Sequence, residues 1–98
     1  MNRPNIEFIA ALETIVKGRL DAGSDESYTA RLAAAGTKRI AQKVGEEGVE
    51  LALAATSGNQ QEVIDEAADL IYHLVVLLAD AGLSLEDIAM RLEARHSA

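Results

Sequence analysis

Apolar residues recur at helical spacing along almost the whole chain, and no stretch of useful length alternates apolar and polar residues with a period of two. The pattern therefore predicts an all-α protein of four to five helices. The predicted helices cover residues 6 to about 20, a short stretch from 27 that stops at Gly36, 37 to about 56, 60 to 81, and 85 to about 95. The polar residues 21–26 are expected to form a loop.

Short polar side chains and glycines mark the ends of these helices. The expected N-caps are Asn5, Thr37, Asn59 and Ser84. Ser84 and Asp87 together resemble a capping box, and glycines such as Gly58 and Gly82 are expected to end helices. The connection at residues 57–59 is short, so the helices on either side of it should pack as a central antiparallel hairpin.

The helix over residues 60–81 is apolar over a wide arc, which is typical of a helix in the middle of a bundle. Its apolar positions are Val63, Ile64, Ala67, Ile71, Leu74, Val75, Leu78 and Ala81. The same helix nevertheless carries Glu66 and Asp69 in its first half. Acidic side chains on such a helix need partners, and this conflict indicates a site.

The preceding helix carries three more carboxylates. At about 100° per residue, Glu46, Glu47 and Glu50 share one side of that helix, and Lys43 projects between Glu50 and Glu47. The opposite side is expected to hold Ile40, Val44, Gly48, Leu51 and Ala55.

The two acidic groups are expected to face each other. Glu66 and Asp69 are three residues apart and are therefore neighbours on the helix surface, with Glu62 one turn before them and His73 one turn after. Both groups lie about two turns from the predicted hairpin turn. They should therefore meet at the same height.

Five converging carboxylates repel one another unless protons or cations neutralise them. Ligand sets made only of oxygen favour Mg²⁺ or Mn²⁺, and Mg²⁺ held by carboxylates commonly binds the phosphates of a substrate. The alternative is a solvated acidic face, because Glu is a good helix former. The spacing by itself leaves both interpretations open.

Composition narrows the class of protein. The chain has 98 residues, which suits a single domain over residues 1–98, and the absence of cysteine excludes disulfides, thiolate zinc and Fe–S clusters. The net charge of −7 argues against a nucleic-acid partner. No secretory signal or membrane-spanning run is visible, so we expect a cytoplasmic protein with no membrane partner. A monomer this small is marginally stable, which favours oligomerisation.

Longer segments resemble a known family. Glu46-Glu47-x-x-Glu50 followed by Glu66-x-x-Asp69 is similar to the signature of the all-α nucleoside triphosphate pyrophosphohydrolases, which include MazG-like enzymes and dimeric dUTPases. Residues 27–32, 36–47 and 66–74 resemble phosphoribosyl-ATP pyrophosphohydrolase, the second enzyme of histidine biosynthesis. The resemblance runs from about Phe8 to Arg95.

The resemblance implies an enzyme that hydrolyses the α–β phosphoanhydride of 1-(5-phosphoribosyl)-ATP, giving 1-(5-phosphoribosyl)-AMP and pyrophosphate. It implies that all five carboxylates hold Mg²⁺, with Mn²⁺ as a possible substitute, and that one of them orients or deprotonates the attacking water. It also implies a homodimer. The chain is short and has no cysteine, whereas many relatives are fused to a cyclohydrolase with a cysteine-ligated zinc, so we expect the stand-alone form.

The basic residues are candidate substrate ligands. Lys43 could contact a phosphate or could pair with Glu47 or Glu50. Lys38 and Arg39, near a helix N-terminus, could bind the ribose 5-phosphate or form a solvated basic pair. His73 is expected to be a hydrogen-bonded, half-buried histidine rather than a catalyst.

Two other functions stay open. One is a house-cleaning pyrophosphohydrolase that acts on non-standard nucleoside triphosphates. The other is a non-catalytic helical dimerisation module whose carboxylates only bind a cation.

Overall fold

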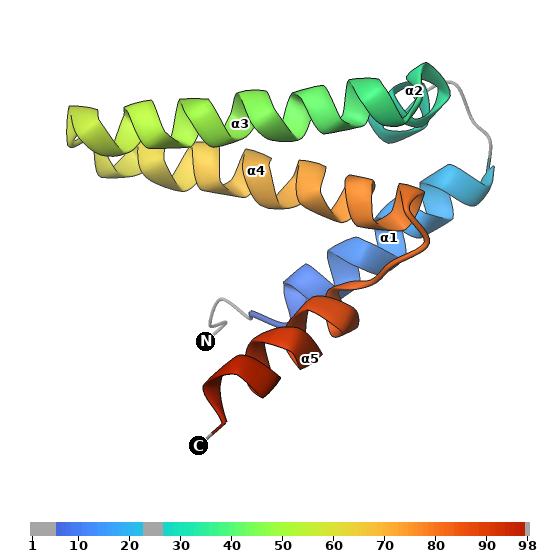
Figure 1. Cartoon of the computed structure of the whole chain (residues 1–98). Coiled ribbons are helices and arrows are strands. Elements are labelled where there is room, and N and C mark those ends of the chain that lie inside the picture. The colour runs from blue at the N-terminus through green and yellow to red at the C-terminus, as the bar shows by residue number, and fades with distance from the viewer. Residues whose placement is uncertain (1–5, 23–26, 98) are drawn as a thin grey trace, which may run out of the picture.

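The computed structural model describes residues 6–22 and 27–97, and every regular element in those two ranges is an α-helix (Figure 1). The helices are α1 (Phe8–Ala22), α2 (Tyr28–Ala35), α3 (Thr37–Ser57), α4 (Gln60–Asp80) and α5 (Leu85–His96). The predicted all-α class is confirmed, with the upper of the two expected helix numbers.

Helices α3 and α4 lie side by side and antiparallel, as the short connection predicted (Figure 1). Gly58 ends α3 with a φ of 79°, in the left-handed region that glycine enters without a steric penalty. The Asn59 side chain then accepts a hydrogen bond of 3.1 Å from the backbone N–H of Glu62, which confirms it as the N-cap of α4. This turn fixes the relative height of the acidic groups on the two helices.

Helices α1 and α2 pack against the end of the hairpin that is far from Gly58 (Figure 1). Their apolar side chains meet those of α3 and α4 in one core. The buried residues of this core are Val16, Leu32, Ile40, Val75 and Val76. The predicted capping box of Ser84 and Asp87 opens α5, and the backbone N–H of Leu85 donates a hydrogen bond of 2.7 Å to Glu13 of α1.

Some helix boundaries differ from the prediction. Helix α1 begins two residues later than expected, because the carbonyl groups of Ile6 and Glu7 accept hydrogen bonds as part of a preceding turn. It also continues through Asp21 and Ala22, which were expected to lie in a loop. Asn5, the expected cap, lies outside the described residues.

The expected N-cap at Thr37 is wrong. Gly36 occupies the N-cap position of α3 with a φ of 98°, and no side chain caps that end. The hydroxyl of Thr37 instead donates a hydrogen bond of 2.7 Å to Asp80 Oδ2, which ties the start of α3 to the end of α4.

The apolar arc of α4 is fully buried only in its second half, where α1 and α2 pack, and Val63 and Ala67 in its first half are half-buried. Val75 and Val76 are fully buried in the second half, whereas Ile64 in the first half is 58% exposed, contrary to the expectation for a central helix. Ala81, also expected on the buried arc, is exposed at the C-cap. In the described ranges, no single helix is long and apolar enough to cross a membrane; α4 and α5 would qualify only together, and they are bent by 105° where they join.

Candidate active site

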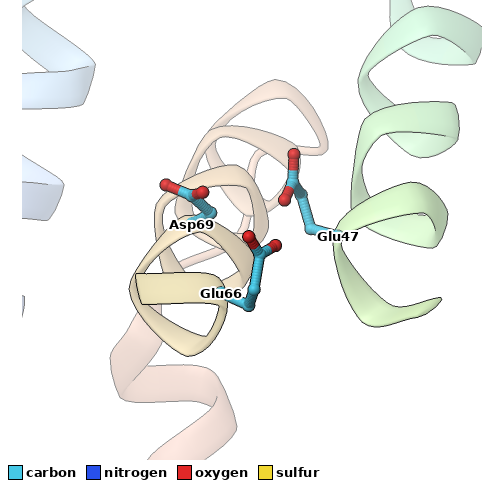
Figure 2. Close-up of side chains that lie close together, drawn as sticks. All are labelled: Glu47, Glu66 and Asp69. Atoms are coloured by element: carbon cyan, nitrogen blue, oxygen red, sulfur yellow. The ribbon is translucent and has the colours of Figure 1, made fainter. Parts of the chain in front are cut away.

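Three carboxylates from the hairpin meet between α3 and α4. Each of Glu47, Glu66 and Asp69 places one carboxylate oxygen within 4.8 Å of the other two. Figure 2 shows Glu47 reaching from α3 toward Glu66 and Asp69, which project from successive turns of α4. The predicted convergence of the two acidic groups is therefore present for these three residues.

The site contains buried oxygen atoms that the protein leaves unsatisfied. Among the described residues, Glu47 Oε2 and Glu66 Oε2 are buried and have no hydrogen-bond partner, and Glu47 as a whole is only 6% exposed. A buried acceptor without a partner costs stability, and an ionised one costs more. A proton, a cation or a bound water molecule can complete the coordination of such oxygens.

Glu50 joins this cluster through Glu66. A hydrogen bond with Glu50 raises the pKa of Glu66 to about 7, and burial together with the negative charges of Glu50, Glu47 and Asp69 acts in the same direction. Two carboxyl groups can form a hydrogen bond only when one carries a proton. In the metal-free protein, Glu66 therefore holds a proton up to nearly neutral pH.

Glu46 is directed toward its own helix rather than into the cluster. It accepts a hydrogen bond of 3.0 Å from Gln42 Nε2, and its Oε1 lies 3.4 Å from Lys43 Nζ. The same ammonium lies 3.5 Å from Glu47 Oε1. Lys43 therefore pairs with Glu47, one of the two expected partners, and also with Glu46, which was not expected as a partner.

The pKa of Lys43 is raised in this setting. Partial burial lowers it, but the hydrogen bond to Glu46 and the electrostatic influence of Tyr28, Glu46 and Glu47 outweigh that effect. Lys43 thus remains a cation at the edge of the cluster and balances part of its negative charge.

The expected division of α3 into an acidic side and an apolar side is wrong at two positions. Glu47 lies on the buried side of the helix together with Ile40 and Ala54, and Ala55 is exposed. The reason is the direction of the partner helix. Glu47 lies about 60° beyond Glu50 around the helix axis, and that difference points its side chain at α4.

Lys38 and Arg39 are exposed in the first turn of α3, about two turns before Glu46 along the helix axis. The structure thus separates this basic pair from the carboxylates, at a distance that an extended ligand could span.

An aromatic group on α2 and α4 lies beside the cluster and was only partly foreseen. His73 is hydrogen-bonded as expected but buried rather than half-buried, with Nδ1 2.7 Å from the carbonyl oxygen of Asp69 and Nε2 2.9 Å from the Tyr28 hydroxyl. Because a carbonyl only accepts, Nδ1 carries the proton, and in the neutral ring Nε2 accepts from Tyr28. Thr29 and Tyr72 form a second hydrogen bond between the same helices. No sequence signal pairs Tyr72 with Thr29, because their contact depends on how α2 packs.

Two hollows border the carboxylates and share Glu50. The first, of about 240 Å³, is lined by Glu50, Leu53, Ala54, Glu62 and Glu66. The second, of about 510 Å³, is lined by Gln42, Gly45, Glu46, Val49 and Glu50. Glu62, which the motif leaves out, therefore belongs to the immediate surroundings of the site.

Comparison with known proteins gives the family of this chain. The sequence model of the family described as phosphoribosyl-ATP pyrophosphohydrolase matches residues 9–96. The chain belongs to this family. The residues matched to phosphoribosyl-ATP pyrophosphohydrolase include all five carboxylates, the residues that line both hollows and the aromatic group.

Two similar proteins are longer than this chain. The histidine biosynthesis bifunctional protein HisIE of Photobacterium profundum is 57% identical over 95 residues, which are 97% of this chain and 46% of that protein. The protein of the same name from Vibrio vulnificus is 62% identical over 85 residues, 87% of this chain and 40% of that protein. The chain thus spans less than half the length of these two relatives.

Proposed function

We propose that this chain hydrolyses 1-(5-phosphoribosyl)-ATP to 1-(5-phosphoribosyl)-AMP and pyrophosphate, in the biosynthesis of histidine. The observation that carries the proposal is the convergence of Glu47, Glu66 and Asp69, with buried unsatisfied oxygens, in a chain of the phosphoribosyl-ATP pyrophosphohydrolase family. An acidic face that served only solubility would leave its oxygens in water. Here two of them are buried.

The same residues fit a divalent cation. The donor set consists of carboxylate oxygens, which suits Mg²⁺ or Mn²⁺, and the unsatisfied oxygens of Glu47 and Glu66 supply unused acceptor capacity. We propose that Glu47, Glu50, Glu66 and Asp69 hold Mg²⁺ and that Glu46 assists from the edge. When bound, Mg²⁺ neutralises phosphate charge and the charge that develops during phosphoryl transfer.

The chain's own residues divide the remaining work. One of the carboxylates accepts a proton from the attacking water, whose oxygen forms a bond to phosphorus as the α–β bridging oxygen leaves with pyrophosphate. Lys43 lies beside the carboxylates as a cation and can contact a phosphate. Lys38 and Arg39, two turns away, are the proposed ligands of the distal ribose 5-phosphate.

Pyrophosphate release from phosphoribosyl-ATP in the presence of Mg²⁺ tests this function directly. Comparable kcat/KM for a panel of non-standard nucleoside triphosphates would favour the house-cleaning alternative. Binding of Mg²⁺ without release of pyrophosphate from any nucleotide would favour the non-catalytic module.

We also propose a cytoplasmic homodimer. Large apolar side chains are exposed on α4 and α5, including Ile64 at 58%, Met90 at 61% and Leu92 at 50%. Covering them in a second copy would enlarge a core that is small in one chain. Light scattering at micromolar concentration should then give about twice the chain mass of 10.4 kDa, and a fully active monomer would contradict the dimer.

A further inference from the structure

The larger of the two hollows is not explained by the carboxylate chemistry. Glu46 and Glu50 form its acidic edge, whereas Gly45 and Val49 form its floor on the outer side of α3. Val49 is 61% exposed. The hollow therefore presents an apolar surface to solvent directly beside the groups proposed to bind the triphosphate.

Gly45 is an unusual choice for this floor. It lies in the interior of the 21-residue helix α3, where glycine is less stable than alanine. A Cβ atom built at Gly45 meets no atom within 4 Å, so packing inside the chain does not require glycine. Its backbone is exposed, and a bare helix backbone lets a flat group approach closely.

We propose that this hollow is the binding site for the purine base of the nucleotide, with the ring lying over the Gly45 backbone and the Val49 methyl groups. This inference rests on the proposed function, since it places the base of that substrate. Glu50 lines both this hollow and the smaller hollow that contains Glu66 of the cluster, so a base in the larger hollow is contiguous with a triphosphate at the cluster. The Gln42 amide and the two carboxylates supply polar groups at the edge of the ring.

A second copy of the chain is the competing occupant of this surface. The two occupants differ in what Gly45→Ala should change. A methyl group on the floor of a base site weakens nucleotide binding and leaves the molecular mass unaltered. A methyl group in a subunit interface lowers the mass or weakens the association.

The test compares two ligands by calorimetry in the presence of Mg²⁺. The α,β-methylene analogue of ATP carries the base and resists hydrolysis at the α–β bridge, whereas inorganic tripolyphosphate carries no base. Gly45→Ala should raise the Kd of the analogue by about tenfold and the Kd of tripolyphosphate by less than about twofold. The same variant should raise the KM for phosphoribosyl-ATP with little change in kcat, and should raise Tm by about 2–5 °C.

Gly48→Ala is the matched control. Gly48 is also an interior glycine of α3 with open space around its Cβ position, but it lies about 160° around the helix from Glu46 and Glu50. Gly48→Ala should raise Tm by a similar amount and leave the Kd of both ligands unchanged. Val49→Thr, which keeps the shape of the side chain and replaces a methyl group by a hydroxyl, should weaken the analogue alone.

The proposal is overturned if Gly45→Ala weakens the binding of both ligands equally, weakens the binding of neither, or lowers the mass measured by light scattering. Turnover of phosphoribosyl-ATP by the wild type tests the proposed function separately. A wild type that prefers the analogue over tripolyphosphate but releases no pyrophosphate removes the proposed function and leaves the base site. An active wild type with an unaffected Gly45→Ala variant removes only the base site.

Discussion

The two halves of the α3–α4 hairpin are packed in opposite ways. Beside α1 and α2, the hairpin contributes Ile40, Val75 and Val76 to a core from which solvent is excluded. Nearer the Gly58 turn, its inner surface carries converging carboxylates with unsatisfied oxygens, and Leu53 is 63% exposed on its outer surface. One continuous pair of helices thus combines an apolar half and an acidic half.

The difference separates stability from function. Burial of apolar side chains in the first half stabilises the hairpin, whereas the acidic half contains groups whose mutual repulsion opposes folding. A ligand that binds only the folded state recovers that cost as binding energy. Changes in cation concentration or side-chain charge should therefore act mainly through the acidic half. Changes in side-chain volume should act mainly through the apolar half.

Removal of divalent cations should have the largest effect and should touch only the acidic half. We expect EDTA to reduce pyrophosphate release by at least about a thousandfold, with helicity measured by circular dichroism unchanged. Added Mg²⁺ or Mn²⁺ should restore the rate, and Ca²⁺ should restore little because its looser geometry positions phosphates poorly. A metal-free enzyme that kept its rate would contradict the proposed role of the carboxylates.

Neutral isosteres in the acidic half should remove activity without removing the fold. Glu47→Gln, Glu50→Gln and Asp69→Asn should each lower kcat/KM by at least about a hundredfold, or roughly 2.7 kcal/mol of transition-state stabilisation. Without metal, each variant should melt at or above the wild-type Tm, because a repulsive charge is gone. Added Mg²⁺ should raise Tm more for the wild type than for the variants.

Asp65→Asn is the control for these isosteres. Asp65 is exposed on α4, one turn before Asp69, and lies outside the cluster. The variant should keep nearly full activity. If Asp65→Asn is as inactive as Asp69→Asn, or if the cluster variants unfold at room temperature, function and stability are not separated between the two halves as we infer.

A conservative change in the apolar half should give the reverse result. Ile40 is fully buried, so Ile40→Val should leave a small cavity and lower the free energy of unfolding by about 1 kcal/mol. For a domain of this size, Tm should fall by about 4–8 °C. Assays well below Tm should show an unchanged kcat/KM per folded molecule, and a specific loss of activity would link the two halves more closely than we infer.

The smallest expected effect is on the pH dependence of stability. The pKa of Glu66 is raised from 4.5 to about 7, so between these values the folded state holds a proton that the unfolded state releases. Stability of the metal-free protein should therefore be lost as pH rises from about 4.5 through 7. Glu66→Gln should remove this part of the slope in a series of thermal melts, and an unchanged slope would show that Glu66 is not the responsible group.

Local signals predicted most of the fold. Asn59 and Ser84 were identified as caps because a short polar side chain before an apolar periodic segment acts on its own neighbours. Thr37 has the same local signal, yet its hydroxyl binds Asp80 across the hairpin. Asp80 is distant from Thr37 in the sequence, so the local sequence could not show that Thr37 binds Asp80 instead of capping α3.

The site was predicted at the level of which helices meet, and less well at the level of side-chain direction. Helical spacing groups Glu46 with Glu47, but only the position of α4 shows that Glu47 is buried and that Glu46 pairs with Gln42 and Lys43. The exposure of Ile64 could not be predicted for a similar reason. The sequence shows that α4 has an apolar arc, but it does not show how much of that arc α1 covers.

The turn at Gly58 also bears on the order of folding. Glu50 and Glu66 are joined through only the last turns of α3 and the first turns of α4, whereas Glu13 and Leu85, which link α1 to α5, are 72 residues apart. Closing the shorter loop costs less chain entropy, so the hairpin can form before α1 docks. In that order of folding, the carboxylates would come together on the way to the transition state. Neutralising them with protons or a cation should therefore speed folding more than it slows unfolding.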